Sequence, residues 1–253
     1  NFAMLKLYDT LTRRLDVVEN NNETIKLYSC GPTVYDFAHI GNLRSFLFPD
    51  IIKRTLEHNG QKVDWVMNIT DVDDKTIKKT IEKYGATATP KELSEYTKQF
   101  TELFKQNLTD LNINIDEIRF INVSDTIPEI QKFIIGLLDK GYAYKADDGS
   151  TYFSIEKYQL DFGDYGQLVG QDFLEGKKVG ARVAVDEYEK DNLSEFALWK
   201  AKNDDDGQIF WDHEVLGQGR PGWHIECSAI NNIAFNGEAT DIHTGGVDLI
   251  FPH

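Results

Sequence analysis

Apolar positions in the first part of the chain switch from the spacing of a strand to that of a helix and back. Residues 25–29 predict a short strand that enters a turn at Gly31-Pro32, and apolar residues at alternate positions over 63–69 predict a second strand. Between them, apolar residues recur every three or four positions over 39–58, which predicts a helix that Pro49 should kink or split. A strand–helix–strand order is typical of parallel strands joined by a crossover helix, so the sequence predicts an α/β fold with a doubly wound parallel sheet.

Helical and strand patterns continue down the chain. Residues 73–84 predict a short helix, and Thr89 with Glu92 has the pattern of a capping box at the start of a longer one. A strand is predicted over 115–123, and another helix should begin near Thr126.

The pattern changes beyond that helix. Residues 142–145 and 151–155 flank an Asp-Gly turn, which predicts a β-hairpin, while charge and glycine dominate 163–212. Helical spacing returns near residue 221, so we expect an α+β insertion within the sheet domain. The expected parts are residues 1–125, the insertion 126–205, and the second part of the sheet domain, 206–253.

Composition narrows the class of protein. The 253 residues carry 27 Lys and Arg against 42 Asp and Glu, a formal charge of −15, which argues against wrapping nucleic acid over the whole surface. A hydrophobic content of 41% excludes wholesale disorder. The sequence has no uninterrupted run of about 18 apolar residues, so it predicts no membrane span. Two cysteines cannot form a disulfide scaffold, so we expect a protein of the reducing cytoplasm. Because no membrane span is predicted, we also expect no membrane partner.

The first candidate site is the tetrapeptide His39-Ile40-Gly41-Asn42 at the predicted start of the first helix. The free N–H groups and the dipole of a helix N-terminus favour phosphate. Gly41 would let a nucleotide approach the backbone, and His39 could hydrogen-bond its oxygens. The same letters also suit an ordinary exposed histidine at a helix start, so both interpretations stay open.

The two cysteines form the second candidate. Cys30 ends the first predicted strand, where open α/β sheets bind their ligands, and Cys227 lies on the predicted C-terminal helix. Three histidines share that C-terminal stretch: His224, His243 and His253. Cysteine and histidine are preferred ligands of zinc. Without a Cys-x-x-Cys spacing, two buried thiols remain an alternative.

Two further segments combine acids, amides and glycines. Residues 68–75 follow the second predicted strand and could bind a metal or ribose hydroxyls, or simply cap the next helix. Residues 241–248 include Gly245, Gly246 and Asp248. They suit a nucleoside lying against the backbone with the carboxylate at a hydroxyl, or a tight turn.

Taken together, these segments resemble the class I cysteinyl-tRNA synthetases. The matching blocks occur in the order of the family: residues 28–36 running into 39–42, then 68–75, 220–228 and 241–253. The resemblance implies a Rossmann-like class I catalytic domain, and this chain would be the N-terminal catalytic half of a longer enzyme. It also implies activation of L-cysteine with ATP and magnesium, and transfer of the cysteinyl group to the terminal ribose of tRNA(Cys). We expect a monomer.

The resemblance assigns roles residue by residue. Zinc ligands are matched by Cys30, Cys227 and His253, with one zinc per chain and a glutamate beyond His253 as the fourth ligand. The amino-acid pocket is matched by Thr70, Trp223 and His243. The catalytic ATP signature is matched by His39, Gly41 and Asn42, with asparagine where histidine is more usual. The adenosine positions are matched by Gly246 and Asp248.

Zinc gives a physical reason for the choice of cysteine. Cysteine and serine have nearly the same volume, and an apolar pocket separates such near-isosteres only ~10–200-fold. A soft thiolate binds zinc strongly, whereas a serine hydroxyl does not. Three alternatives remain: an adenylate-forming ligase that joins cysteine to an amino-sugar acceptor, a non-catalytic zinc- or tRNA-binding module, and a nucleotidyltransferase of other specificity.

Overall fold

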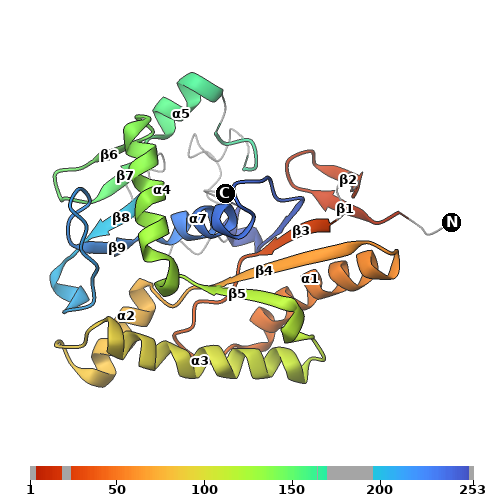
Figure 1. Cartoon of the computed structure of the whole chain (residues 1–253), viewed down its shortest axis with the longest axis horizontal. Coiled ribbons are helices and arrows are strands. Elements are labelled where there is room, and N and C mark those ends of the chain that lie inside the picture. The colour runs from red at the N-terminus through yellow and green to blue at the C-terminus, as the bar shows by residue number, and fades with distance from the viewer. Residues whose placement is uncertain (1–3, 19–23, 164, 170–195, 251–253) are drawn as a thin grey trace. The chain divides into compact units, whose positions relative to one another are not determined.

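The computed structural model describes residues 4–18, 24–163, 165–169 and 196–250 (Figure 1). The chain divides into two compact units. The first comprises residues 1–126, 204–209 and 227–245, and the second comprises 127–203, 210–226 and 246–253. Among the described residues, no helix is long and apolar enough to cross a membrane.

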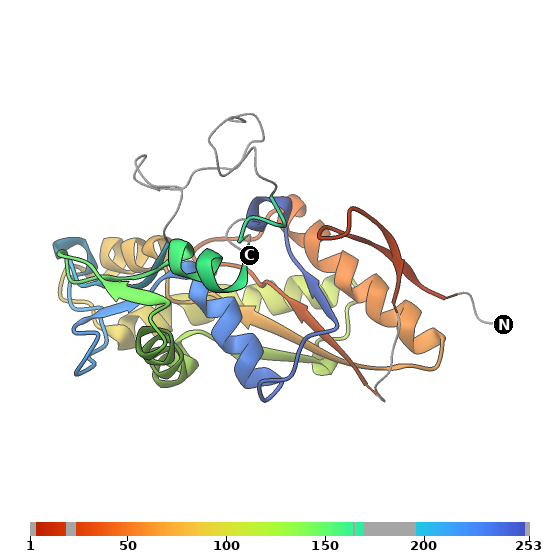
Figure 2. The same ribbon diagram turned by 90° about the horizontal axis from the view of Figure 1, so that it is seen from above.

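A parallel sheet forms the centre of the first unit. Its strands are β3 (Thr24–Ser29), β4 (Lys62–Ile69), β5 (Ile118–Asn122) and β10 (Ile242–Thr244), in the order β10-β3-β4-β5. Every neighbouring pair is parallel, and Figure 2 shows β10 beside β3 although more than 200 positions separate them in the chain. The predicted parallel α/β fold is therefore confirmed.

The order of the strands creates a switch point. The chain builds outward from β3 through β4 to β5, and then returns to place β10 on the opposite side of β3. In open α/β sheets, ligands bind outside the carboxyl ends of the strands at such a reversal. The carboxyl ends of β3 and β10 therefore mark the expected ligand site.

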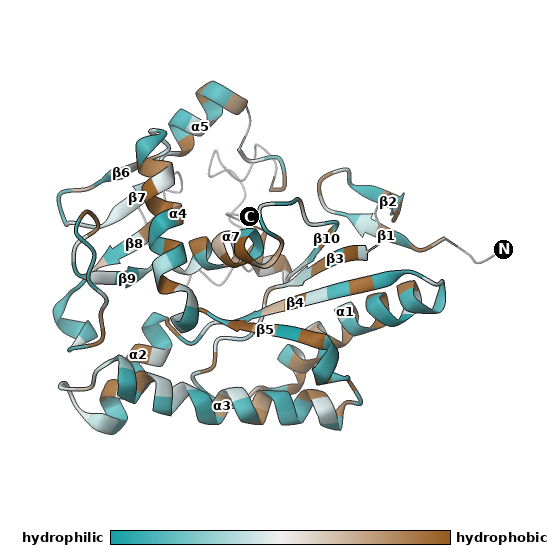
Figure 3. Ribbon diagram, in the orientation of Figure 1, coloured by the Kyte–Doolittle hydropathy of each residue, from teal (hydrophilic) through white to brown (hydrophobic). Residues whose placement is uncertain are grey.

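Helices α1 (Ile40–His58) and α3 (Pro90–Asp110) pack on this sheet, with α2 (Asp74–Tyr84) between them in sequence (Figure 1). Phe46 and Leu56 of α1 and Phe104 of α3 join one apolar core with the strands. In Figure 3 the strands β4 and β5 carry both brown and teal positions, while α3 is mostly teal with brown positions at intervals. That pattern is typical of a helix that buries one face.

Two details of the sequence prediction are corrected. Helix α1 runs unbroken through Pro49, which is buried, so the expected split does not occur. A proline removes only one helical hydrogen bond, and packing on both sides of it can hold the helix together. The strand expected over 115–123 is shorter, because residues 115–117 form a 3₁₀ turn, η1, before β5.

Other predicted boundaries are confirmed. Thr89 and Glu92 form the predicted capping box of α3, and α2 ends at Gly85, whose φ of 89° favours glycine. The first unit also contains a hairpin that the patterns did not predict, made of β1 (Lys6–Asp9) and β2 (Arg14–Val17). The 3₁₀ turns η2 (Ser124–Thr126) and η3 (Asp204–Asp206) also belong to this unit.

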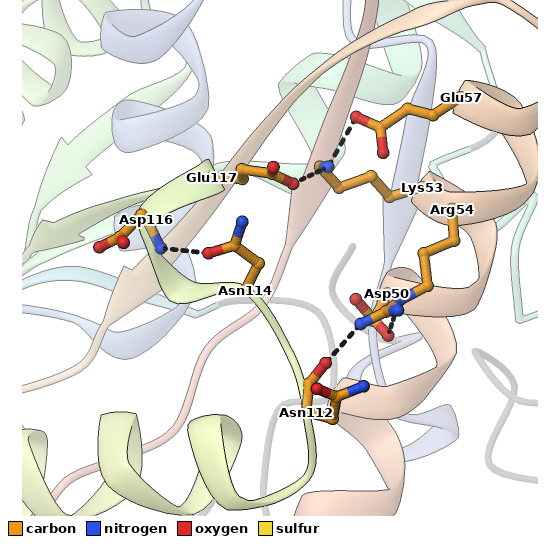
Figure 4. A network of polar contacts seen from close by, with 8 residues as sticks. All are labelled: Asp50, Lys53, Arg54, Glu57, Asn112, Asn114, Asp116 and Glu117. Atoms are coloured by element: carbon orange, nitrogen blue, oxygen red, sulfur yellow. Dashed lines mark hydrogen bonds and ion pairs between the residues drawn. The ribbon is translucent and has the colours of Figure 1, made fainter.

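A polar network ties α1 to the segment that enters β5 (Figure 4). Lys53, which is 4% exposed, bonds the carboxylates of Glu57 and Glu117. Burial works against the charge of Lys53, but the two hydrogen bonds outweigh it and raise the pKa of the ammonium group. Arg54 donates to the backbone carbonyl of Asn112 in the same network.

The second unit contains an antiparallel sheet. Its strands β6 (Ala143–Lys145), β7 (Thr151–Phe153), β8 (Ala197–Ala201) and β9 (Gly219–Pro221) are neighbours in that order. The hairpin predicted at the Asp-Gly turn is confirmed as the β6–β7 pair. Helices α4 (Ile127–Asp139) and α5 (Ile155–Phe162) belong to this unit, as does the 3₁₀ turn η4 (Val247–Leu249).

Candidate active site

The candidate site lies at the carboxyl ends of the parallel strands. Cys30 follows β3, and its N–H donates to the carbonyl of Thr244 at the end of β10, at 3.0 Å. On the other side of β3, the N–H of Thr70 donates to the carbonyl of Pro32 at 3.0 Å. The loop after β3 is therefore held from both sides, at the switch point of the sheet.

Two sulfur atoms and an imidazole meet at this point. The Sγ of Cys30 lies 3.5 Å from the Sγ of Cys227, which is carried by α7 (Trp223–Ala234), and 3.2 Å from the Nε2 of His243 on β10. Both cysteines are free thiols. The two cysteines are 197 positions apart in the chain, so the fold alone brings them together.

The environment of Cys227 favours its thiolate. The hydrogen bond with Cys30 lowers the pKa of the Cys227 thiol, although burial works against this, and the hydroxyl of Tyr28 lowers it further. The rings of Tyr28 and His243 also meet edge to face, with their centroids 5.0 Å apart. Tyr28 therefore touches both the sulfur side and the imidazole side of the cluster.

One buried amide organises the floor of the site. The Oδ1 of Asn68 accepts hydrogen bonds from the hydroxyl of Tyr28 at 3.2 Å and from the N–H of Gly31 at 2.9 Å, and lies 3.9 Å from the Sγ of Cys227. Its Nδ2 donates to the Oγ1 of Thr70 at 3.1 Å. Asn68 is 2% exposed. The side chain of Asn68 thus contacts the thiol of Cys227, the backbone of Gly31 and the hydroxyl of Thr70. Thr70 is one of the residues that the sequence predicts for the amino-acid pocket.

Asn68, Tyr28 and Gly31 received no individual role from the sequence. Gly31 lies so close to β4 that a Cβ would be 1.6 Å from the carbonyl oxygen of Asn68. The available signal was an amide within the apolar second half of β4, between Met67 and Ile69. A buried polar residue of this kind needs hydrogen-bond partners, and here the partners are the site.

The tetrapeptide at the start of α1 adopts a closed arrangement. His39 is the N-cap of the helix, and its Nδ1 accepts hydrogen bonds from the N–H groups of Gly41 at 3.1 Å and Asn42 at 3.3 Å. The Oδ1 of Asn42 accepts in return from the N–H of His39 at 3.1 Å. The side chain of His39 is exposed, so its remaining ring nitrogen can face a ligand.

The acidic segment after β4 has mainly structural contacts. Asp73 caps α2 by accepting from the N–H of Lys75 at 2.9 Å. Asp71 is buried, and it accepts from the N–H of Ser124 at 2.9 Å and from its hydroxyl at 2.5 Å. Burial raises the pKa of Asp71. The capping interpretation of this segment therefore holds for Asp73, while Asp71 joins β4 to the turn η2.

The remaining predicted residues lie in the second unit or outside the described residues. Trp223 begins α7, is 39% exposed, and has its ring 5.0 Å from that of His224. Gly246 precedes η4 and Asp248 lies within it. His253 lies outside the described residues. Within the described part of the chain, no three His, Cys, Asp or Glu side chains form a recognised metal-binding group.

Comparison with known proteins places the chain in a family. The family described as "tRNA synthetases class I (C) catalytic domain" matches residues 16–253. A cysteine–tRNA ligase of Koribacter versatilis is 46% identical over 251 residues, which are 98% of this chain and 47% of that protein. A cysteine–tRNA ligase of Chlamydia felis is 45% identical over 254 residues, which are 100% of this chain and 50% of that protein.

Similarity to a solved structure supports the fold. A structure from Campylobacter jejuni, whose title names an arginyl tRNA synthetase, aligns with a TM-score of 0.54 at 14% identity. The alignment covers 91% of this chain and 49% of that one. The chain spans about half the length of the curated relatives it matches.

Proposed function

Because the chain belongs to the class I cysteinyl-tRNA synthetase family, we propose that it activates L-cysteine with ATP and serves its transfer to the terminal ribose of tRNA(Cys). In the first step a carboxylate oxygen of cysteine attacks the α-phosphorus of ATP. A new O–P bond forms, the bond from that phosphorus to the bridging oxygen breaks, and pyrophosphate leaves. In the second step a ribose hydroxyl attacks the carbonyl carbon, and AMP leaves.

One observation carries this proposal: the thiols of Cys30 and Cys227 and the imidazole of His243 meet at the switch point of a parallel sheet. This is where an open α/β fold binds its ligand. A nucleotidyltransferase of other specificity would leave the paired thiols without a role. The geometry therefore supports cysteine as the substrate.

The paired thiols suit a zinc ion. Two thiolates bound tetrahedrally at about 2.3 Å from zinc would have their sulfur atoms roughly 3.8 Å apart. The observed separation of 3.5 Å is close to that value. We propose Cys30, Cys227 and His253 as protein ligands, with one zinc per chain. The metal would bind the substrate sulfur as a thiolate, which a serine hydroxyl cannot match.

The other proposed roles follow the family motifs. Thr70, held by Asn68, and His243, held against Tyr28, would line the amino-acid pocket together with Trp223. His39 would donate to the phosphates of ATP, which carries magnesium, and so stabilise the charge that grows there. Gly246 and Asp248 would hold the adenosine. We also propose residues 126–205 as the connective insertion, and a cytoplasmic monomer.

Pyrophosphate exchange tests the first step directly. The full-length protein is expected to exchange labelled pyrophosphate into ATP when cysteine is present, and to prefer cysteine to serine by more than the ~200-fold that an apolar pocket can reach. Charging of tRNA(Cys), measured beside an amino-sugar acceptor, then tests the second step. Absence of cysteine-dependent exchange would refute the proposal. Transfer of the cysteinyl group only to the amino sugar would show that the amino sugar, and not tRNA(Cys), is the acceptor.

A further inference from the structure

The side chain of Asn68 connects the loop after β3 with the segment that follows β4. Its Oδ1 accepts from the N–H of Gly31 at 2.9 Å, and its Nδ2 donates to the Oγ1 of Thr70 at 3.1 Å. Gly31 directly follows Cys30 in the chain, and Thr70 directly follows the last residue of β4. One buried amide, 2% exposed, therefore joins the sulfur side of the candidate site to a residue proposed for the amino-acid pocket.

The backbone determines which way this amide points. A backbone N–H can only donate, so the group of Asn68 that faces Gly31 must be the carbonyl oxygen. The amino group is then left for Thr70, whose hydroxyl oxygen accepts from it. An amide turned by 180° would place its amino group against the N–H of Gly31, two donors without an acceptor. The fold, and not a ligand, therefore sets the orientation of the Asn68 side chain.

Backbone hydrogen bonds join the same two segments without involving the amide. The N–H of Thr70 donates to the carbonyl of Pro32 at 3.0 Å, and the N–H of Val34 donates to the carbonyl of Thr70 at 3.1 Å. These bonds hold the backbone of Thr70, whereas the amide of Asn68 holds its side-chain oxygen. Removal of the amide should therefore leave the backbone of these segments in place, while it loosens the Thr70 hydroxyl and the turn at Gly31.

We propose that Asn68 is a positioning residue that fixes the Thr70 hydroxyl relative to the thiols of Cys30 and Cys227. This inference rests on the proposed function and deepens it. Cysteine is a short amino acid, so it can place its sulfur at the metal and lie against Thr70 only if the separation of the two is fixed. A misplacement of about 1 Å can cost on the order of 100-fold in an enzyme reaction. Asn68 would thus act without touching the substrate.

The oxygen of Asn68 should affect the affinity for the metal. In the full-length protein, Asn68→Ala is expected to weaken zinc binding about 10- to 100-fold, because the turn at Gly31 no longer holds Cys30 in place. Asn68→Asp keeps an oxygen for the N–H of Gly31, so its zinc affinity should stay within about threefold of that of the unmutated protein. Competition with a chromophoric zinc chelator measures both affinities and needs no activity.

The amino group of Asn68 should affect the binding of cysteine. Asn68→Ala and Asn68→Asp both lose the donor to Thr70, so each is expected to raise KM for cysteine in pyrophosphate exchange about 10-fold and KM for ATP no more than about twofold. In the Thr70→Val background, Asn68→Ala should raise KM for cysteine by no more than about threefold. A full 10-fold rise in that background would show that Asn68 does not act through Thr70, and would overturn the inference.

Asn231→Ala is the matched control for structural damage. Asn231 lies on α7 within the first unit, and its Oδ1 accepts from the hydroxyl of Thr240 at 2.6 Å. This variant should keep the zinc affinity and both KM values. Equal losses in Asn231→Ala and Asn68→Ala would attribute the effect to general damage and overturn the positioning role.

Two further outcomes decide the inference. Unchanged zinc affinity and unchanged KM for cysteine in Asn68→Ala would overturn it. If Asn68→Ala does not fold, Asn68→Asp carries the test, and an unchanged KM for cysteine in that variant would overturn the link to Thr70. If the unmutated protein exchanges no pyrophosphate, the proposed function fails, while zinc competition still tests the link through Gly31.

Discussion

At the scale of single residues, the floor of the candidate site depends on one close approach. Gly31 and Asn68 belong to neighbouring segments whose backbones leave no room for a side chain between them. The same contact lets the N–H of Gly31 reach the amide of Asn68, which also bonds Tyr28 and Thr70. The requirement for glycine here is therefore steric, and it serves the geometry of the cluster.

Gly31→Ala tests that requirement. A Cβ 1.6 Å from the carbonyl oxygen of Asn68 would force the loop away from β4, so we expect a loss of about 3 kcal/mol or more in the free energy of unfolding. Urea unfolding followed by tryptophan fluorescence measures it. The matched control is Gly136→Ala in α4, where nothing lies within 4 Å of the new methyl group and a gain of about 0.5–1 kcal/mol is expected. Equal responses of the two variants would contradict the steric account.

Asp71 gives a second prediction, in the pH dependence of stability. Burial raises the pKa of its carboxyl group in the folded protein above the ordinary value of 3.8. The folded state thus binds this proton more tightly than the unfolded state. The stabilising contribution is present below pH 3.8 and is lost as the pH rises through the raised pKa.

Asp71→Asn removes this titration while keeping an oxygen that can accept from the N–H of Ser124. The unfolding free energy of the unmutated protein, relative to that of Asp71→Asn, should therefore fall as the pH rises from 3.8 through the raised pKa of Asp71. Urea unfolding of both proteins across this range measures the difference. A constant difference, or one that rises with pH, would show that burial does not control this carboxyl group.

At the scale of elements, helix α1 links the site to the rest of the first unit. His39 caps its N-terminus, and Lys53 lies in its interior. Lys53 bonds the carboxylates of Glu57 and Glu117, and Glu117 lies just before β5 (Figure 4). The carboxylates of Glu57 and Glu117 are about half exposed, at 42% and 51%. Water can therefore solvate both of them if the ammonium group is removed, so the apolar stem of Lys53 should matter more than its charge.

Two substitutions of Lys53 separate the contribution of its apolar stem to the unfolding free energy from the contribution of its charge. Lys53→Met keeps a long apolar chain and should cost no more than about 1 kcal/mol of unfolding free energy. Lys53→Ala opens a space beneath the network and should cost about 2–3 kcal/mol. Chemical unfolding at low and high salt checks both values. If Lys53→Met proved as costly as Lys53→Ala, the ion pairs would be the main contribution.

At the scale of the whole molecule, local patterns predicted most of the first unit. Spacing and capping residues located β3, β4, α2 and α3, because each of these depends on nearby residues. They did not predict the β1–β2 hairpin or the continuity of α1 through Pro49. Those features depend on packing with distant parts of the chain, which overrides local preference.

Local patterns likewise predicted only part of the candidate site. The motifs singled out Cys30, Cys227 and His39, but the roles of Tyr28 and Asn68 depend on which strands become neighbours. Because Gly41 has no Cβ, the sequence predicted that a nucleotide can approach the backbone there, and this stays a prediction. The structure adds that a Cβ on Gly41 would lie 2.9 Å from the ring of His39, a contact that no sequence pattern contains.

The metal proposal can be tested at this scale because its ligands come from opposite ends of the chain. Each ligand removed weakens a four-coordinate site, so Cys30→Ser and Cys227→Ala should each lower the zinc content of the full-length protein from about one per chain toward zero. Elemental analysis of metal-replete, purified protein measures it. Zinc-free unmutated protein would refute the proposal.

His243 supplies the most discriminating variant. Its Nε2 lies 3.2 Å from the sulfur of Cys30, close enough for a ligand, yet the family motif assigns it to the amino-acid pocket and His253 to the metal. If that assignment holds, His243→Ala keeps about one zinc per chain and raises KM for cysteine in pyrophosphate exchange. If the zinc is lost instead, His243 is itself a ligand, and the proposed ligand set has to exchange His253 for His243. Cys227→Ala, purified and analysed in the same way, serves as the control for the zinc content that remains when a ligand is removed.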